Sequence, residues 1–349
     1  MFRRLGLPAV LALAATALTL PIADAAPANE TAARPSAKTA RDTAKAARAA
    51  AALRATTTTA TTTTTTTATT TTATNTTTTA LATATKATTA AATAKAARAK
   101  ANVAHRGASA AAPENTLAAF RLARTKRATL FELDVQETKD HRLVLMHDTT
   151  LARTTNVESV FPRRSPWRVR DFTLAEIRRL DAGSWFASRY RGERVPALGD
   201  ALRTMQSSGL GLLLEVKKPS YYPGIERRIV AELRRNPAWL RPDPNERRLI
   251  VQSFDVASMR RFHRLLPNVP VGLIGKQPTS QIPALSKWAD QINPPYASLT
   301  ASYVKTVHKY RMESFVYTID NPAKMRTALK LGVDGIITNK PDVLHGVLH

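Results

Sequence analysis

Residues 130–148 read LFELDVQETKDHRLVLMHD, and this stretch decides how the surrounding chain folds. It contains two apolar runs typical of β-strands, 130–136 and 143–147, joined by only six residues. A crossover between parallel strands needs about a dozen residues or more, so the short link predicts an antiparallel hairpin. Such a hairpin places Asp134 opposite His147, to within a residue or two.

Three carboxylates lie on predicted strands. Glu132 and Asp134 are two residues apart and therefore share a face, while Glu215 follows the apolar run 212–214 on another strand. Neighbouring carboxylates repel each other unless a cation or a proton lies between them. Because all three offer oxygen, the set suits Mg²⁺ or Ca²⁺ better than zinc. The alternative is a set of carboxylates that simply pair with the many arginines of the chain.

Cationic and titratable side chains accompany these carboxylates. Arg106 follows His105, and Lys217 lies two residues after Glu215 and so on the same face. Fixed cations stabilise the negative charge that a phosphodiester gains in its transition state. His105 and His147 each end a predicted strand, and imidazole titrates near neutrality, so both are candidates for general acid and base.

Residues 101–349 alternate short apolar runs with helical patterns, which is typical of an α/β domain. This length suits one (β/α)8 barrel, which commonly has about 250 residues. Nine segments have a strand pattern, one more than the barrel holds, so at least one is wrong or lies outside it. The predicted strands are 102–105, 130–136, 143–147, 211–216, 249–253, 269–274, 291–293, 314–318 and 335–338. The predicted helices are 116–126, 174–181, 198–206, 225–235, 256–265, 301–309 and 323–331.

Three residues beside the motifs have predicted supporting roles. Asn115 is expected to be the N-cap of the first helix, a structural role. Glu114 is expected to orient His105, and Asp148 to be structural.

Residues 149–196 interrupt the alternation of strands and helices. They are rich in Arg, Pro, Ser and aromatic residues and are too long for an ordinary loop. We expect a small insertion that caps the mouth of the site, where a substrate head group could be selected. For most of its aromatic residues, packing in a small satellite core is the favoured interpretation.

The N-terminal part has two compositional segments. Residues 1–25 resemble a secretory signal peptide, because Arg3 and Arg4 precede an apolar run and a small-x-small site ends the segment. Residues 26–100 are almost entirely Ala, Thr, Lys and Arg, which predicts a disordered low-complexity linker. No other apolar run is long enough to cross a bilayer, so we expect a secreted, extracellular or cell-wall-associated protein without a transmembrane segment.

The chain is strongly basic, with 51 Lys and Arg against 26 Asp and Glu and a net charge of +25. The linker holds ten basic and two acidic residues. Such charge suits an anionic cell-wall polymer or lipid surface bound through the basic tail; a solvated cationic surface is the alternative, and for the linker itself a spacer without a recognition role is the favoured interpretation. No helix-turn-helix, zinc-finger or RNA-binding motif accompanies it, so no specific nucleic-acid partner is predicted. Cysteine is absent, so the fold does not depend on disulfides.

Four motifs in order resemble the glycerophosphodiester phosphodiesterase family over roughly residues 102–345. They are HRG at 105–107, PENT at 113–116, ELD at 132–134 and HD at 147–148. The resemblance implies a distorted TIM barrel with a hairpin at its second and third strands. It also implies metal-dependent hydrolysis of glycerophosphodiesters to an alcohol and sn-glycerol 3-phosphate, in which a substrate hydroxyl attacks phosphorus and water opens a cyclic phosphate.

The same resemblance assigns roles to seven residues. Glu132, Asp134 and Glu215 would be the ligands of one divalent metal ion, Mg or Ca. General acid and base catalysis falls to His105 and His147, and phosphate binding to Arg106 and Lys217. Departures from the family pattern are His141 for the glycine of the hairpin turn, Tyr317 for a late tryptophan, and Asn339 for an aspartate. The last two concern substrate size and head group rather than the chemistry.

Two other functions stay open. The first is a phospholipase D-like lyase that acts on lysophospholipid or sphingomyelin head groups, since residues 318–322 faintly resemble a motif of that group. The second is a non-catalytic basic module that binds cell-wall teichoic acid. A stable cyclic phosphate product would favour the first, and hydrolysis lost on His147→Ala would exclude the second.

Overall fold

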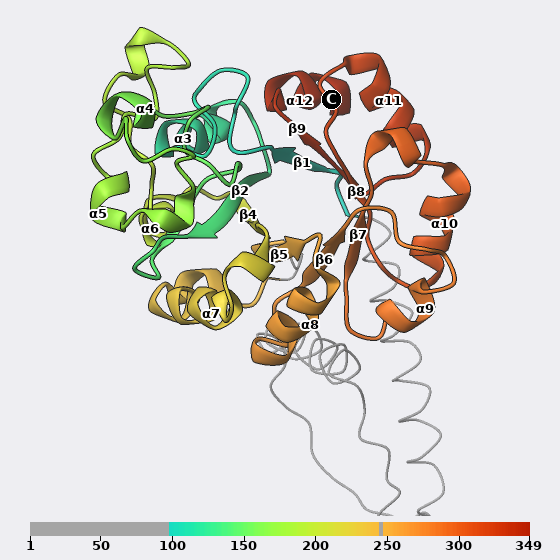
Figure 1. Ribbon diagram of the computed structural model, residues 1–349. Helices are drawn as coiled ribbons and strands as arrows, with labels where there is room; N and C mark the ends of the chain where they lie inside the picture. Colours follow the sequence, from blue (N-terminus) through green and yellow to red (C-terminus); the bar gives the residue numbers. More distant parts are fainter. Residues whose placement is uncertain (1–97, 244–246) are drawn as a thin grey trace, which may run out of the picture. The chain divides into compact units, whose positions relative to one another are not determined.

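The computed structural model describes residues 98–243 and 247–349, which Figure 1 draws in colour. The predicted signal peptide (1–25) and the predicted linker as far as residue 97 lie outside the described residues. Within the described ranges, no helix is long and apolar enough to cross a bilayer.

Eight strands form a parallel sheet that curls into a nearly closed barrel (Figure 1). Their order is β7-β6-β5-β4-β2-β1-β9-β8, and isolated parallel bridges from Gln291 to Glu313 and from Pro295 to Tyr317 link the β7 and β8 edges. The predicted (β/α)8 architecture is therefore confirmed. The strands are β1 (Ala101–Ala104), β2 (Leu130–Glu137), β4 (Gly211–Val216), β5 (Leu249–Ser253), β6 (Val271–Ile274), β7 (Gln291–Asn293), β8 (Phe315–Val316) and β9 (Gly335–Thr338).

The ninth strand, β3 (Leu143–Leu145), explains the surplus in the sequence pattern. It pairs antiparallel with β2 and lies off the barrel path, so the predicted hairpin is confirmed. The backbone N–H of Met146 donates to the carbonyl of Asp134 at 3.0 Å. Met146 rather than His147 is thus opposite Asp134, one residue from the predicted register.

The hairpin turn has a conformation that suits glycine. His141 has φ of +57°, in the left-handed region that residues with a Cβ seldom adopt. Its N–H donates to the carbonyl of Thr138, and the N–H of Thr138 donates to the carbonyl of Arg142, both at 3.0 Å. A histidine therefore occupies a position at which the fold favours glycine.

Helices cover the outside of the barrel (Figure 1). Six lie where the sequence predicts them: α3 (Leu117–Thr125), α6 (Leu198–Met205), α7 (Ile225–Arg235), α8 (Val256–Leu265), α10 (Ala301–Lys309) and α11 (Pro322–Lys330). The helix predicted over 174–181 is a single turn, α5 (Leu174–Ile177), because the N–H groups of Arg179 and Leu180 bond carbonyls three residues back instead of four. The pattern missed α4 (Val157–Val160), α9 (Ile282–Leu285) and α12 (Pro341–Leu348).

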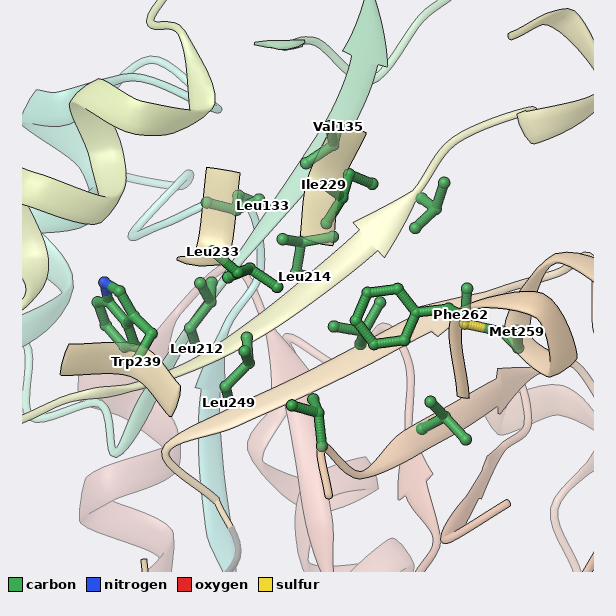
Figure 2. Packing of buried hydrophobic residues seen from close by; sticks show 14 of the residues in the cluster. Leu133, Val135, Leu212, Leu214, Ile229, Leu233, Trp239, Leu249, Met259 and Phe262 are labelled. Atoms are coloured by element: carbon green, nitrogen blue, oxygen red, sulfur yellow. The ribbon is translucent and has the colours of Figure 1, made fainter. Parts of the chain in front are cut away.

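The main core lies between the outer face of the sheet and the helices. Figure 2 shows Leu133 and Val135 of β2 and Leu214 of β4 against Ile229 and Leu233 of α7. Because side chains alternate along a strand, burying Leu133 and Val135 outside the barrel turns Glu132 and Asp134 to its inside. The apolar pattern of β2 therefore positions its carboxylates.

The insertion, 149–196, packs a second hydrophobic cluster with residues of the hairpin. Phe172 is fully buried in it, and Phe161 and Trp167 pack against it. The favoured interpretation of these aromatic residues, a small satellite core, is confirmed for these three. Trp185 differs, because 41% of it is exposed.

Candidate active site

The turn after β1 presents His105 and Arg106 at the carboxyl end of the barrel. Arg106 has φ of +55°, and its backbone N–H donates to Oε2 of Glu132 at 2.7 Å. Gly107 has φ of +83°, and a Cβ there would lie 2.6 Å from Ala119 of α3. Only glycine fits at this position, which gives the HRG motif a steric reason.

The three predicted carboxylates form one buried cluster. Ligand oxygens of Glu132, Asp134 and Glu215 all lie within 4.8 Å of one another. Asp134 and Glu215 are direct neighbours in the β2–β4 register. Glu132 lies two residues before Asp134 on β2, further from the carboxyl ends of the strands. Oε1 of Glu132 is buried and has no hydrogen-bond partner. A buried carboxylate oxygen without a donor is what a site made for a cation contains when no cation is present.

The electrostatics of this cluster show the same need for positive charge. Burial, with Asp134 beside it, raises the pKa of Glu215 to about 7, and burial raises the pKa of Glu132 well above its ordinary value. Burial would also raise the pKa of Asp134, but the charges of Lys217 and Arg106 outweigh it and lower that pKa.

Asn115 fixes the position of Asp134. Its Nδ2 donates to Oδ2 of Asp134 at 2.8 Å, and its Oδ1 accepts the backbone N–H of Asp134 at 3.0 Å. The predicted N-cap role is wrong, because the side chain of Thr116 caps α3 through the N–H of Ala119. Asn115 has φ of +57°, which turns its side chain away from the helix and toward the barrel.

Two cations lie among the carboxylates. Nζ of Lys217 is 2.8 Å from Glu215 and 3.6 Å from Asp134. Nε of Arg106 is 3.4 Å from Asp134, and its Nη1 donates to Glu114 at 2.9 Å. Both side chains line the cavity described below, where an anion can reach them.

His105 has a neutral partner. Its Nδ1 is 2.7 Å from Oδ1 of Asn339, while Nδ2 of Asn339 donates to Asp320 at 2.7 Å. Because the amide nitrogen is engaged there, Oδ1 must accept, and Nδ1 of His105 carries the proton. Burial, with Arg106 nearby, lowers the pKa of His105 to about 4. The imidazole is therefore neutral near pH 7 and presents Nε2 as a base.

His147 has an anionic partner. Its Nδ1 lies 2.7 Å from Oδ1 of Asp148. Burial would raise the pKa of Asp148, but hydrogen bonds from Arg153 and His147 bring it down to about 2. Asp148 is therefore ionised over the working pH range and presents a carboxylate oxygen to Nδ1 of His147. The expectation that Asp148 is merely structural is corrected by this contact.

A cavity of about 240 Å³ opens between the two histidines. Six of the seven predicted site residues line it; the seventh, Asp134, is buried. Apolar residues of later strand ends form the facing part of the lining: Phe254, Ile274, Tyr317 and Ile337. The lining includes no residue of the insertion, 149–196; that the insertion selects a head group stays a prediction.

The profile of the glycerophosphoryl diester phosphodiesterase family matches residues 105–343, most of the chain. This chain belongs to that family. A glycerophosphodiester phosphodiesterase of Bacillus subtilis (strain 168) is 36% identical over 259 residues, which cover 70% of this chain and 85% of that protein. One from Caldanaerobacter subterraneus is also 36% identical, over 247 residues that cover 69% of this chain and 95% of that protein.

Solved structures of the glycerophosphoryl diester phosphodiesterase family have the same fold. A phosphodiesterase of Oleispira antarctica, in complex with the product sn-glycerol-3-phosphate, superimposes with a TM-score of 0.63 at 25% identity, covering 70% of this chain and 95% of that one. The glycerophosphodiester phosphodiesterase of Agrobacterium tumefaciens gives 0.58 at 29% identity, with 70% and 98% covered. The protein is a glycerophosphodiester phosphodiesterase, a phosphoric diester hydrolase.

The structure also adds residues that the family motifs did not reveal. Glu114 contacts Arg106 and Arg153, so the prediction that it orients His105 is wrong; Asn339 does so. In the sequence Asn339 was visible only as a departure from the family pattern. Nothing in the sequence distinguished Arg153 from the other arginines of the insertion.

Proposed function

We propose that this phosphodiesterase hydrolyses glycerophosphodiesters to an alcohol and sn-glycerol 3-phosphate, with one divalent metal ion and two histidines of unlike function. The observation that carries the proposal is the buried acidic cluster, with its unpartnered Glu132 oxygen, in a cavity lined by both histidines. The product bound to the Oleispira antarctica relative supports the nature of the product.

Glu132, Asp134 and Glu215 would hold the metal ion. Three carboxylates that offer only oxygen fit Mg²⁺ or Ca²⁺. When bound, such an ion neutralises charge on the phosphate and lowers the barrier to attack at phosphorus. The raised pKa values of Glu132 and Glu215 agree with this role, because burial and the neighbouring Asp134 disfavour their ionised forms, which a bound cation would stabilise.

His105 would act as the general base and His147 as the general acid. The neutral amide of Asn339 keeps the proton on Nδ1 of His105, so Nε2 is free to take a proton from the attacking oxygen. The carboxylate of Asp148 contacts Nδ1 of His147 and orients its ring, so that Nε2 can deliver a proton to the leaving alcohol. The two imidazoles are chemically identical, but the partner of His105 is neutral and the partner of His147 is anionic. This difference gives the two histidines different proposed roles.

Arg106 and Lys217 would bind the phosphate. Both line the cavity and both are held in place by carboxylates, so they are positioned before substrate arrives. Fixed cations of this kind stabilise the transition state more than the ground state, because the phosphate gains negative charge as the bond to the attacking oxygen forms.

The parts of the chain outside the described residues carry a further proposal. We infer from composition that residues 1–25 direct export and that the basic linker binds an anionic cell-wall polymer or lipid surface. Cell fractionation of the full chain and of a chain without 26–97 tests this. Retention of both forms in the wall fraction would rule out the linker as the attachment.

The decisive experiment for the activity is release of sn-glycerol 3-phosphate from glycerophosphocholine by the purified protein. We expect release with Mg²⁺ or Ca²⁺, and none with a chelator or with Glu132→Gln. Glu158→Gln, an exposed carboxylate of the insertion, is the matched control and should keep activity. A cyclic phosphate that accumulates without opening would instead indicate a lyase, and binding without turnover would indicate the binding module.

A further inference from the structure

Arg153 joins two halves of the site that are otherwise separate. Its Nε and Nη2 donate to the carboxylate of Asp148 at 2.6 and 3.1 Å. Its Nη1 and Nη2 donate to the carboxylate of Glu114 at 2.9 and 2.7 Å. Asp148 in turn contacts His147, and Glu114 contacts Arg106. One guanidinium therefore connects, through one carboxylate on each side, a histidine and an arginine that line the cavity.

The surroundings of Arg153 hold its backbone firmly. Leu151 is fully buried, and its N–H donates to the carbonyl of Trp167 at 2.9 Å. Thr154, which follows Arg153, is also buried, and its hydroxyl contacts Sδ of Met146. Arg153 itself is half-exposed, yet its head group makes four hydrogen bonds to carboxylates. The satellite core of the insertion thus presents this side chain to the site.

The chemistry of the contact requires a guanidinium. Asp148 and Glu114 are both carboxylates, and they would repel each other and turn toward water without a shared cation. The planar fork of arginine offers five donors and can bind two carboxylates at fixed angles. A lysine has the charge, but its single ammonium cannot reproduce both two-pronged contacts.

We propose that Arg153 is a positioning residue: Glu114, itself held by Arg106, anchors its guanidinium, which holds Asp148 against His147 and so aligns the general acid. The inference rests on the proposed function, in which His147 protonates the leaving alcohol. It gives the insertion a part in the reaction although no residue of the insertion lines the cavity.

The test compares Arg153→Gln and Arg153→Lys with a matched control, Arg178→Gln. Arg178 is an exposed arginine of the same insertion that pairs with Asp200, away from the site. For glycerophosphocholine we expect kcat of Arg153→Gln to fall by about 10- to 100-fold, a part of the 10²–10⁴ that a general acid supplies. Arg153→Lys should recover less than half of that loss, and Arg178→Gln should be unchanged.

A second substrate separates alignment of the acid from general damage. In glycerol 3-phosphate esterified with p-nitrophenol, the leaving group departs as a stable anion and needs no proton. Arg153→Gln should therefore turn over this ester within about threefold of the wild type, as should His147→Ala. Adding Arg153→Gln to His147→Ala should cost kcat for glycerophosphocholine little more, because the group it aligns is already absent.

The outcomes distinguish the two proposals. If His147→Ala leaves glycerophosphocholine hydrolysis intact, the proposed function itself is wrong. If His147→Ala is impaired but Arg153→Gln behaves like Arg178→Gln, only the positioning role is wrong. Equal loss on both substrates for Arg153→Gln, or full rescue by Arg153→Lys, would also overturn the positioning role. The melting temperature of each variant, measured alongside, identifies any that fails to fold.

Discussion

Oδ1 of Asn339 lies 2.7 Å from Nδ1 of His105, and it joins the last barrel strand to the first. Asp320 orients the amide, because its carboxylate accepts hydrogen bonds from the backbone N–H and from the side-chain Nδ2 of Asn339. The hydroxyl of Ser109 donates to the same Oδ1 at 2.8 Å. The imidazole thus has a fixed orientation and a fixed proton, and burial together with the charge of Arg106 outweighs the charge of Asp134, which favours the protonated form.

The first prediction concerns the pH dependence of activity. Because the pKa of His105 is lowered to about 4, the base stays unprotonated at pH values well below its ordinary 6.5. We expect the acid limb of kcat/KM, measured with saturating metal, to have its midpoint near pH 4. Protonation of the base lowers activity, so the rate falls as pH decreases through this value. A midpoint at 6.5 in a stopped assay from pH 3.5 to 9 would contradict the structure.

The second prediction concerns metal binding and pH. The pKa of Glu215 is about 7 without metal, above its ordinary 4.5, so protons and metal compete for it below neutrality. A raised acid pKa also means that the metal-free fold loses stability as pH rises through 7, when Glu215 ionises. Bound Mg²⁺ or Ca²⁺ should therefore raise the melting temperature more at pH 8 than at pH 5. Equal shifts at both values, against NaCl of the same ionic strength, would contradict this.

The third prediction separates stability from activity at the acidic cluster. Glu132→Gln replaces one of three crowded buried carboxyl groups, whose ionised form burial and Asp134 disfavour, and the new amide can donate to a neighbouring carboxylate. We expect a higher melting temperature for the metal-free variant, with loss of metal-induced stabilisation and at least about a 100-fold loss of hydrolysis. Thermal unfolding with chelator and then with metal measures both. A lower metal-free melting temperature would show that the charge is already compensated.

The fourth prediction uses two glycines with similar backbone angles. Gly107 has φ of +83° and no room for a Cβ, whereas Gly209 has φ of +79° with open space around it. Gly209→Ala should cost only the conformational strain, about 1–2 kcal/mol in the free energy of unfolding, and keep activity. Gly107→Ala should cost about 3 kcal/mol or more and lose activity, because the clash displaces the turn that carries His105. Urea denaturation and kcat together make the comparison; similar losses at both sites would contradict the steric argument.

Much of this fold could be predicted because its signals are local. The short link between two apolar runs demands a hairpin, and alternation along residues 130–137 puts Glu132 and Asp134 on one face. Proximity of these two to Glu215 followed from parallel strands ending at the same edge of a sheet. The register of the hairpin was predicted to within a residue or two and differs by one, since it depends on which face of β3 packs against the insertion.

The site residues that the sequence did not predict depend on contacts between distant segments. Asn339 and His105 are 234 residues apart, and only barrel closure brings them together. Arg153 gains its partners because a satellite core fixes its backbone, and no local pattern encodes that core's orientation. The prediction of the N-cap was wrong for a different reason. Asn115 and Thr116 are both good N-cap residues, but the side chain of Asn115 makes two hydrogen bonds to Asp134 instead.

The antiparallel strand β3 leaves the barrel wall, and this gives the enzyme two separately adjustable parts. The strands of the wall lead into the acidic cluster, Arg106, Lys217 and His105, to which we assign the metal, the phosphate and the base. His147, the proposed proton donor, follows a hairpin that packs in its own apolar cluster. Changes in that hairpin and its insertion can therefore adapt the enzyme to alcohols of different basicity during evolution, while the wall that handles the phosphate stays as it is.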